Sequence, residues 1–438
     1  MVGPSREADV IIVGAGISGA SLFYLLSRFS PLERVLLLEQ REQPGQGTSH
    51  FSHNAQTLHQ GDIESNYSLE KSEEVRDAAA LLARYCEHKS DALQPMSRLL
   101  LAEGSQEIEW LKQRFNRIRK LYPNLEWFDA AAIADIEPNV VLDRQSDIAA
   151  IGEDYSPAAM DFGAIAHHFV NDAVQMAEQT NRHFELRPGV HVESIEEKDG
   201  GFVLNSNKGI WRAKAIVVSA GNRTLQLMKQ YGVGDQYLGI TMAGRFYRSR
   251  LGLNGKVYTW QNSAVPFAAI HGDRDFHSDE TRFGPTAHFM PRFEHDIEGT
   301  TRDYLKTFSS PSAWYQALSE LLSQRDIRQH VLSNLKPLVP GVGKDFMAKH
   351  IRKIIPSITA QHLTKEQRGL RTQLYDLEAK KLILGEVKIN PGNGLIFNVT
   401  PSPGASACLA NAWLDLTSLG FWLGFEANVA RLDEVEFS

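Results

Sequence analysis

The sequence predicts an α/β fold, and three consecutive segments near its start carry that prediction. Residues 9–13 (DVIIV) form an apolar, β-branched run of strand length. Residues 17–29 repeat apolar side chains at helical spacing before Pro31, and residues 33–39 (ERVLLLE) form a second apolar run. A strand, a helix and a strand in such close succession make one βαβ unit, which is a building block of parallel sheets.

The rest of the chain also mixes helical and strand patterns. We expect helices over 70–88, 105–122, 162–179, 301–335 and 405–423, and strands over 190–221, 236–300 and 394–399. No internal repeat or long charge block divides the sequence. The expected organisation is therefore a discontinuous α/β domain, made of residues 1–90, 145–235 and 355–438, and a second, mixed-sheet α+β domain, made of residues 91–144 and 236–354.

Length and composition restrict the class of protein. The 438 residues suffice for about two or three domains, and 42% hydrophobic with 23% charged residues is typical of a globular protein. The formal net charge of −7 argues against a broad nucleic-acid-binding surface. Cys86 and Cys408 lie far apart and lack metal-binding spacing, which excludes a disulfide framework, gives no metal site and favours a reducing compartment.

The stretch Val10–Ser27 is the nearest approach to a membrane span, because it carries no charge. Its three glycines and its change of periodicity identify it instead as a buried strand followed by a helix. The acidic residues Glu7 and Asp9 precede it, which is not the cationic start of a secretory signal. We therefore expect a cytoplasmic protein.

The turn between the first strand and helix has the pattern G-x-G-x-x-G, with glycines at 14, 16 and 19. Such glycines allow a tight turn and a close approach of a pyrophosphate, which the free amides and dipole of the helix attract. Glu39 follows the second strand, where an acid binds ribose hydroxyls and disfavours the additional phosphate of NADP. The pattern predicts a Rossmann-like dinucleotide site, with a glycine-rich packing turn as the alternative.

Three features favour FAD over NAD. The glycine pattern lies close to the N-terminus, residues 215–221 (AIVVSAG) resemble a second flavoprotein signature, and the turn Pro401-Ser-Pro-Gly404 begins a helix. A helix N-terminus directed at the flavin would stabilise its anionic reduced form. The turn could also be an ordinary helix start.

Residues 43–66 form a long polar segment without periodicity, rich in Gly, Ser, His, Asn and Gln. Loops of this length are uncommon in compact domains unless they serve a site. We therefore place this segment beside the cofactor. The residues expected to contact FAD are Gly14, Gly16, Ser18, Gly19, Glu39, Gln40, Ser49, Asn54, Ala55, Thr57, Val192, Ala220, Gly221, Pro403, Gly404, Ala405 and Ser406.

Taken together, these and later motifs resemble the malate:quinone oxidoreductases, in their shorter form. Their FAD domain is akin to that of the D-amino-acid oxidase and glycine oxidase group. Besides the N-terminal pattern, the resemblance rests on 54–59 (NAQTLH) with 66–67 (NY), 265–271 (VPFAAIH), 282–285 (RFGP), 369–373 (GLRTQ) and 400–406 (TPSPGAS). The resemblance covers nearly all of the chain.

The resemblance implies oxidation of (S)-malate to oxaloacetate, with electrons passed through FAD to a membrane quinone. A dicarboxylate substrate requires cations, and Arg371 and Arg282 lie in matching motifs where a guanidinium could bind a carboxylate bidentately. A structural ion pair is the alternative for each. Histidine is the natural base near neutral pH, so we expect His271 or His59 in that role. Either ring could instead support the core, the flavin or the loop.

Because quinones reside in lipid, the resemblance also implies peripheral association with the cytoplasmic face of the inner membrane. The basic stretches 112–120 and 344–353 are candidates for contact with anionic headgroups, although solvated helix faces would look the same. The aromatic stretch 419–425 (LGFWLGF) could insert into the interface, but we expect a buried terminal helix there.

Three other functions stay open at this level. One is a related FAD enzyme acting on another 2-hydroxy acid or an amino acid, such as 2-hydroxyglutarate. Another is a protein that holds FAD only as a structural element and binds a partner, and the third is an NAD-linked dehydrogenase. The polar residues in the matching motifs argue against a purely binding role.

Overall fold

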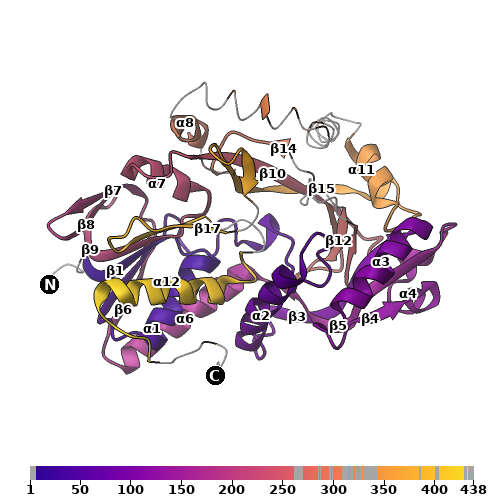
Figure 1. Ribbon diagram of the computed structural model, residues 1–438, viewed down its shortest axis with the longest axis horizontal. Helices are drawn as coiled ribbons and strands as arrows, with labels where there is room; N and C mark the ends of the chain where they lie inside the picture. Colours follow the sequence, from indigo (N-terminus) through magenta and orange to yellow (C-terminus); the bar gives the residue numbers. More distant parts are fainter. Residues whose placement is uncertain are drawn as a thin grey trace.

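The computed structural model describes residues 6–260, 270–284, 286, 288–294, 297, 299–307, 315, 319–320, 323, 325, 328, 343–383, 386–399, 404–428 and 432. Within these residues the chain forms two mixed sheets with helices packed against them (Figure 1). The predicted α/β class is confirmed.

The first sheet has the strand order β17-β18-β9-β1-β2-β6, and β9 also pairs with the antiparallel ribbon of β7 and β8. Its strands are β1 (Glu7–Val13), β2 (Arg34–Leu38), β6 (His183–Arg187), β7 (Val192–Lys198), β8 (Gly201–Ser206), β9 (Gly209–Val218), β17 (Val387–Ile389) and β18 (Leu395–Val399). Because β1 pairs in parallel with β2 and β9, the predicted βαβ unit is confirmed.

Three helices cover one face of this sheet, namely α1 (Ile17–Phe29), α6 (Phe162–Gln179) and α12 (Cys408–Leu423) (Figure 1). The other face packs against α7 (Thr224–Tyr231). The helix predicted over 162–179 has the same bounds as α6. The helix predicted over 405–423 begins three residues later, at Cys408, after a turn.

The second sheet has the order β16-β15-β10-β13-β12-β11-β3-β5-β4, with β14 paired to β10. Its strands are β3 (Leu93–Glu103), β4 (Glu126–Phe128), β5 (Ile148–Met160), β10 (Tyr237–Ser249), β11 (Lys256–Thr259), β12 (His271–Arg274), β13 (Thr281–Gly284), β14 (His288–Phe289), β15 (Thr364–Asp376) and β16 (Lys381–Ile383). The remaining elements are α2 (Leu69–Tyr85), α3 (Gly104–Ile118), α4 (Ala130–Ile136), α5 (Pro138–Val141), α8 (Thr300–Lys306), α11 (Gly343–Ile351) and the short turns η1 (Phe51–His53), η2 (Gly221–Arg223) and η4 (Ala360–His362).

The predicted domain boundaries stay a prediction. Strand pairing nevertheless places β5 and β15 in the second sheet, although the expected boundaries grouped residues 145–235 and 355–438 with the first. Of the helices expected over 301–335, the structure describes α8, and most of the remaining residues lie outside the described part of the chain.

Candidate active site

A cavity of about 540 Å³ lies where residues from both sheets meet. Residues at the carboxyl ends of four parallel strands line it, namely Gly14, Glu39, Ser219 and Val399. Ligands of open α/β sheets bind at this edge. The predicted residues that line the cavity are Gly14, Gly16, Ser18, Glu39, Gln40, Ser49, Asn54, Ala55, Thr57, His59, Val192, Ala220, Gly221, His271, Arg371, Ala405 and Ser406.

Four predicted residues are not among those lining residues. Gly19, Arg282 and Gly404 lie elsewhere, and Pro403 lies outside the described residues. The expected contacts of Gly19 and Gly404 with the cofactor stay predictions, and neither residue lines the cavity.

The three glycines of the turn have different tasks. A Cβ on Gly14 would lie 2.5 Å from the carbonyl oxygen of Ser219, and a Cβ on Gly19 would lie 1.9 Å from that of Gly14. Both positions therefore need glycine for backbone packing. At Gly16 a Cβ would meet only the Ser49 hydroxyl, at 3.3 Å, and the residue lines the cavity. This open, backbone-lined turn fits the pyrophosphate of FAD.

Glu39 sits at the end of β2, as the sequence predicts for a ribose-binding acid. One carboxylate oxygen accepts the amide of Ala15 at 2.7 Å and the other accepts the amide of Arg41 at 2.9 Å. Burial raises the pKa of Glu39, and these amides offset the effect only in part. Ser49 accepts the amide of Ile17 at 2.9 Å, which fixes the polar loop on the start of α1.

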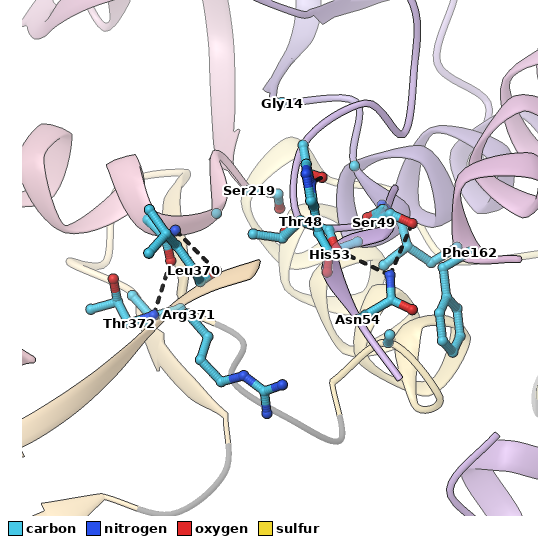
Figure 2. Close-up of a pocket in the computed structure, with 18 of the residues that line it drawn as sticks. Gly14, Thr48, Ser49, His53, Asn54, Phe162, Ser219, Leu370, Arg371 and Thr372 are labelled. Carbon is cyan, nitrogen blue, oxygen red and sulfur yellow. Dashed lines mark hydrogen bonds between the residues drawn. The ribbon is translucent and has the colours of Figure 1, made fainter. Parts of the chain in front are cut away.

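Asn54 organises the polar loop from inside. Its amide nitrogen donates to the carbonyls of Thr48 and Ser49, each at 3.2 Å (Figure 2). The same nitrogen donates to the carbonyl of His50 at 2.9 Å, and its oxygen accepts the amide of Gln56 at 2.9 Å. The loop is therefore a rigid wall of the cavity and not a loose connection, which agrees with the functional role expected for it.

The side chain of Arg371 extends from β15 into the open space of the site (Figure 2). Among the described residues it makes no hydrogen bond or ion pair, although it is half-buried. Burial lowers the pKa of the guanidinium, but arginine stays protonated in proteins. A desolvated cation without a partner is costly, so Arg371 is suited to an anionic ligand.

Two features hold the backbone of Arg371 in place. Asn222 donates to the carbonyl of Leu370 at 3.3 Å and accepts the amide of Thr372 at 2.9 Å, so it brackets Arg371 on both sides (Figure 2). Gly369 lets β15 approach η1, because a Cβ there would lie 2.1 Å from the carbonyl oxygen of His53.

His271 forms a dyad with Asp273. Its Nδ1 lies 2.6 Å from the carboxylate of Asp273, and its ring stacks in parallel on Tyr258 with centroids 4.5 Å apart. Burial raises the pKa of Asp273, but the ammonium of Lys256, 3.3 Å away, and the adjacent His271 outweigh burial and hold that pKa well below its usual range. An ionised carboxylate only accepts, so Nδ1 carries the proton and Nε2 is free to act as a base.

His59 forms a second dyad in the same cavity. Its Nδ1 lies 2.5 Å from Glu64, whose other oxygen accepts the amide of Gly61 at 2.9 Å. The backbone amide of His59 donates to Ser406 at 2.9 Å, which ties this loop to the turn before α12. Both predicted histidines therefore face the cavity, and both have a carboxylate behind them.

Arg282 has a different environment from Arg371. It is fully buried, and its guanidinium donates to the carbonyls of Phe51, Ser52 and Asn54 at 3.2, 3.3 and 2.8 Å. The structure does not bring this guanidinium to the cavity, so its placement supports a role in holding the polar loop in position.

Five further residues of the site were not predicted from the sequence, namely Asp273, Lys256, Tyr258, Glu64 and Asn222. Asp273 had a usable signal, because residues two apart on a strand share a face and Asp273 follows His271 by two. Glu64 lies in the polar segment 43–66, which was itself expected beside the cofactor. Lys256, Tyr258 and Asn222 meet the site only through the tertiary fold.

The family model for malate:quinone oxidoreductase (Mqo) matches residues 6–423. The chain is 34% identical over 441 residues to a probable malate:quinone oxidoreductase from Campylobacter jejuni, covering 97% of each chain. It is also 34% identical over 442 residues to the malate:quinone oxidoreductase of Helicobacter pylori, covering 98% of this chain and 97% of the relative.

The fold is similar to that of L-alpha-glycerophosphate oxidase from Mycoplasma pneumoniae with FAD bound. The TM-score is 0.64 at 16% identity, covering 97% of this chain and 96% of the other. The predicted resemblance and the predicted cofactor are thereby confirmed. The chain belongs to the malate:quinone oxidoreductase family of FAD-dependent enzymes.

Proposed function

We propose that the protein oxidises (S)-malate to oxaloacetate and passes the electrons to a quinone, with Arg371 as the carboxylate-binding residue and His271 as the base. The observation that carries these assignments is that the guanidinium of Arg371, which no described residue pairs, and the dyad of His271 line one cavity together with the glycine turn. That cavity combines a cation, a base and a dinucleotide cradle, which are the groups that the reaction needs.

Arg371 binds one carboxylate of malate. Its planar fork can donate two parallel hydrogen bonds to that carboxylate, and the partly buried setting strengthens the pair because little water competes. Asn222 and Gly369 act on this step indirectly, since they fix the strand that carries the guanidinium.

His271 takes the proton of the alcohol at Nε2. Asp273 holds the ring in the tautomer that leaves Nε2 unprotonated, and it stabilises the imidazolium that forms. Stacking on Tyr258 prevents the ring from rotating out of this position. Bound FAD supplies the acceptor for the hydride of the adjacent carbon.

Anaerobic mixing of the purified enzyme with malate tests this proposal, because oxidised flavin absorbance should be lost. Arg371→Met removes a charged hydrogen-bond donor, and such a bond contributes about 1.5–3 kcal/mol. The malate concentration at which half of the flavin is reduced should therefore rise by roughly 10- to 100-fold. Arg371→Lys keeps the positive charge and should restore part of the affinity for malate. Arg274→Met, which removes a solvent-facing partner of Asp279, is the control. Bleaching by 2-hydroxyglutarate but not by malate would overturn the substrate assignment.

We also propose that the enzyme associates peripherally with the cytoplasmic face of the inner membrane, through the outer side of α12. Among the described residues, no helix combines the length and the apolar character needed to cross a bilayer. Leu419 and Gly420 are buried as expected for a terminal helix, but Leu414, Phe421 and Trp422 are 56%, 80% and 40% exposed. Exposed aromatic side chains of this kind suit the lipid interface.

The basic stretches have a less favourable arrangement for this role. Lys353 pairs with Glu107 at 2.6 Å, so α3 lies beside the end of α11, on the opposite side of the molecule from α12 (Figure 1). Arg114 from the first stretch is buried and donates to loop carbonyls instead of facing solvent. This surface is the alternative membrane contact.

A further inference from the structure

We propose that the two dyads divide the proton chemistry: His59 donates a proton to the quinone during reoxidation, whereas His271 accepts the alcohol proton of malate. This inference rests on the proposed function, because it assigns the second half of the same reaction. The supporting observations are the different charge balance and the different solvent exposure of the two histidines that flank Tyr258.

Both imidazoles face one cavity and flank the same tyrosine. The ring of His271 stacks on Tyr258 at 4.5 Å, and the ring of His59 meets it edge-on at 6.3 Å. In each ring Nδ1 is held by a carboxylate, and no described residue bonds Nε2. The two Nε2 atoms are therefore the groups available for proton transfer.

The surroundings of His59 carry an excess of negative charge. Glu64 contacts the ring, Asp62 pairs with Arg98 at 2.8 Å, and Glu153 lies 4.0 Å from Arg98. The second cation of the group is Arg114, which donates to the carbonyls of the same loop. Lys71 and Glu74 on α2 form an ion pair, so their charges cancel and do not change this balance.

Three carboxylates thus face two guanidinium groups in this buried cluster. A proton on His59 neutralises the excess, and a buried net charge is costly when it is not balanced. The excess of carboxylates therefore stabilises positive charge placed beside the ring of His59, which suits a group that donates a proton. Its Nδ1 proton stays with Glu64, so Nε2 is the donor atom.

The surroundings of His271 have the opposite balance. Asp273 is matched by Lys256, and Asp275 and Glu280 are matched by Arg248 and Arg282. Arg371 then adds one positive charge in the cavity, and no described side chain neutralises it. The described charges around His271 therefore leave no negative excess, so this side of Tyr258 suits the accepting role.

Access also differs between the two sides. The His59 side chain is 20% exposed and that of His271 is 10% exposed. From His59 the lining continues through half-buried Asn66 and Tyr67 to exposed Ser68 at the start of α2. A second, larger substrate reaches the cavity most directly along this side.

The protons and electrons balance under this assignment. Malate loses a hydride to the flavin and a proton to Nε2 of His271, which later releases it to water. The quinone receives the hydride from the reduced flavin on one oxygen and a proton from Nε2 of His59 on the other, which gives the quinol. Water then reprotonates His59.

The two half-reactions of the unmodified holoenzyme provide the first test, followed anaerobically by flavin absorbance. Reduction by malate should become faster as the pH rises, because His271 must be neutral. Reoxidation of dithionite-reduced enzyme by a short-chain ubiquinone analogue should become slower as the pH rises, because His59 must be protonated. Equal pH dependences of the two rates would overturn the assignment.

Variants separate proton donation from structural support. In His59→Gln and Glu64→Gln, reoxidation by the quinone analogue should fall by roughly 100-fold or more, the usual range for loss of a general acid. Reoxidation by ferricyanide, which takes electrons without protons, should stay within about twofold, and added imidazole should restore part of the quinone rate in His59→Ala. The control is His168→Gln, which breaks a solvent-facing imidazole–carboxylate pair with Asp91.

The outcomes distinguish the inference from the function on which it rests. If malate fails to reduce the flavin while dithionite-reduced enzyme still shows the predicted quinone chemistry, the proposed substrate is wrong and the His59 assignment stands. If His59→Gln slows ferricyanide and quinone equally, or slows neither, His59 is not the proton donor. Retained FAD content and an unchanged melting temperature in His59→Gln show that the variant is folded.

Discussion

The carboxylate of Asp273 is fully buried behind His271, 2.6 Å from its Nδ1 and 3.3 Å from the ammonium of Lys256. The three groups come from two neighbouring strands, β11 and β12, whose register pairs Lys256 with Asp273. Because Thr57 also donates to Asp273, at 3.2 Å, this carboxylate links the polar loop to the second sheet. It sets both the orientation and the tautomer of His271.

Replacing Asp273 with Asn should slow malate oxidation while leaving malate binding nearly unchanged. The amide no longer fixes the proton on Nδ1, and loss of general-base catalysis costs roughly 100- to 10,000-fold in rate. Stopped-flow reduction of the flavin gives the rate, and its malate dependence gives the affinity. A larger effect on affinity than on rate would contradict the positioning role.

Asp273 should also make the protein sensitive to acid. Since its pKa is depressed in the folded state, the stabilisation is fully present above the unfolded value near 3.9 and is lost as the pH falls through the lower folded value. Melting temperature measured between about pH 5 and pH 3 should fall less steeply in Asp273→Asn than in the parent. Asp147→Asn, at an exposed position, is the matched control and should keep the parental slope.

Replacing Arg282 with Lys should weaken FAD retention. An ammonium cannot reach the three loop carbonyls that the guanidinium serves, and hydrogen bonds from a charged group contribute about 1.5–3 kcal/mol. The dissociation constant for FAD, measured by flavin fluorescence, should rise by roughly tenfold or more. The control is Arg274→Lys, a substitution on the neighbouring strand, which should leave the dissociation constant for FAD as in the parent. An unchanged FAD affinity in Arg282→Lys would refute the positioning role.

Substituting alanine at Gly19 should destabilise the cofactor-binding turn. The added Cβ would lie 1.9 Å from the carbonyl oxygen of Gly14, and such overpacking costs about 1–3 kcal/mol. The expected results are a lower melting temperature and loss of bound FAD on gel filtration. Gly47→Ala is the control for the melting temperature alone, because no described atom lies within 4 Å of a Cβ there but the residue lines the cavity. Equal effects of the two substitutions would argue against close packing as the cause.

Removing the exposed aromatic residues of α12 should reduce membrane binding. A Phe421→Ser/Trp422→Ser double variant should sediment less with vesicles of anionic phospholipid, while its turnover with a soluble quinone analogue is kept. Tyr155→Ser, another highly exposed aromatic, is the control. If binding is unaffected by the double variant but is lost at high salt, the basic surface of α3 and α11 is the contact.

Local patterns in the sequence were enough to predict the first part of the fold. The alternation of strand, glycine turn, helix and strand uses interactions within a few residues, so β1, α1 and β2 follow from periodicity alone. Glu39 could be placed beside the cofactor site for the same reason, since it directly follows a strand of predictable length. The family resemblance then identified the cofactor.

The tertiary structure decided which of the motif residues face the cavity. Arg371 and Arg282 lie in equally suggestive motifs, yet one guanidinium enters the cavity and the other binds loop carbonyls, because strand register and loop packing set their directions. The same holds for the histidines: both line the cavity, and only long-range pairing shows that excess carboxylates surround His59 while balanced charges surround His271. The sequence alone determined the glycine turn that binds the dinucleotide, because strand, turn and helix patterns depend on residues close together in the chain. The tertiary structure decided which charged groups surround Arg371, His59 and His271, because charges interact through space between distant segments of the chain.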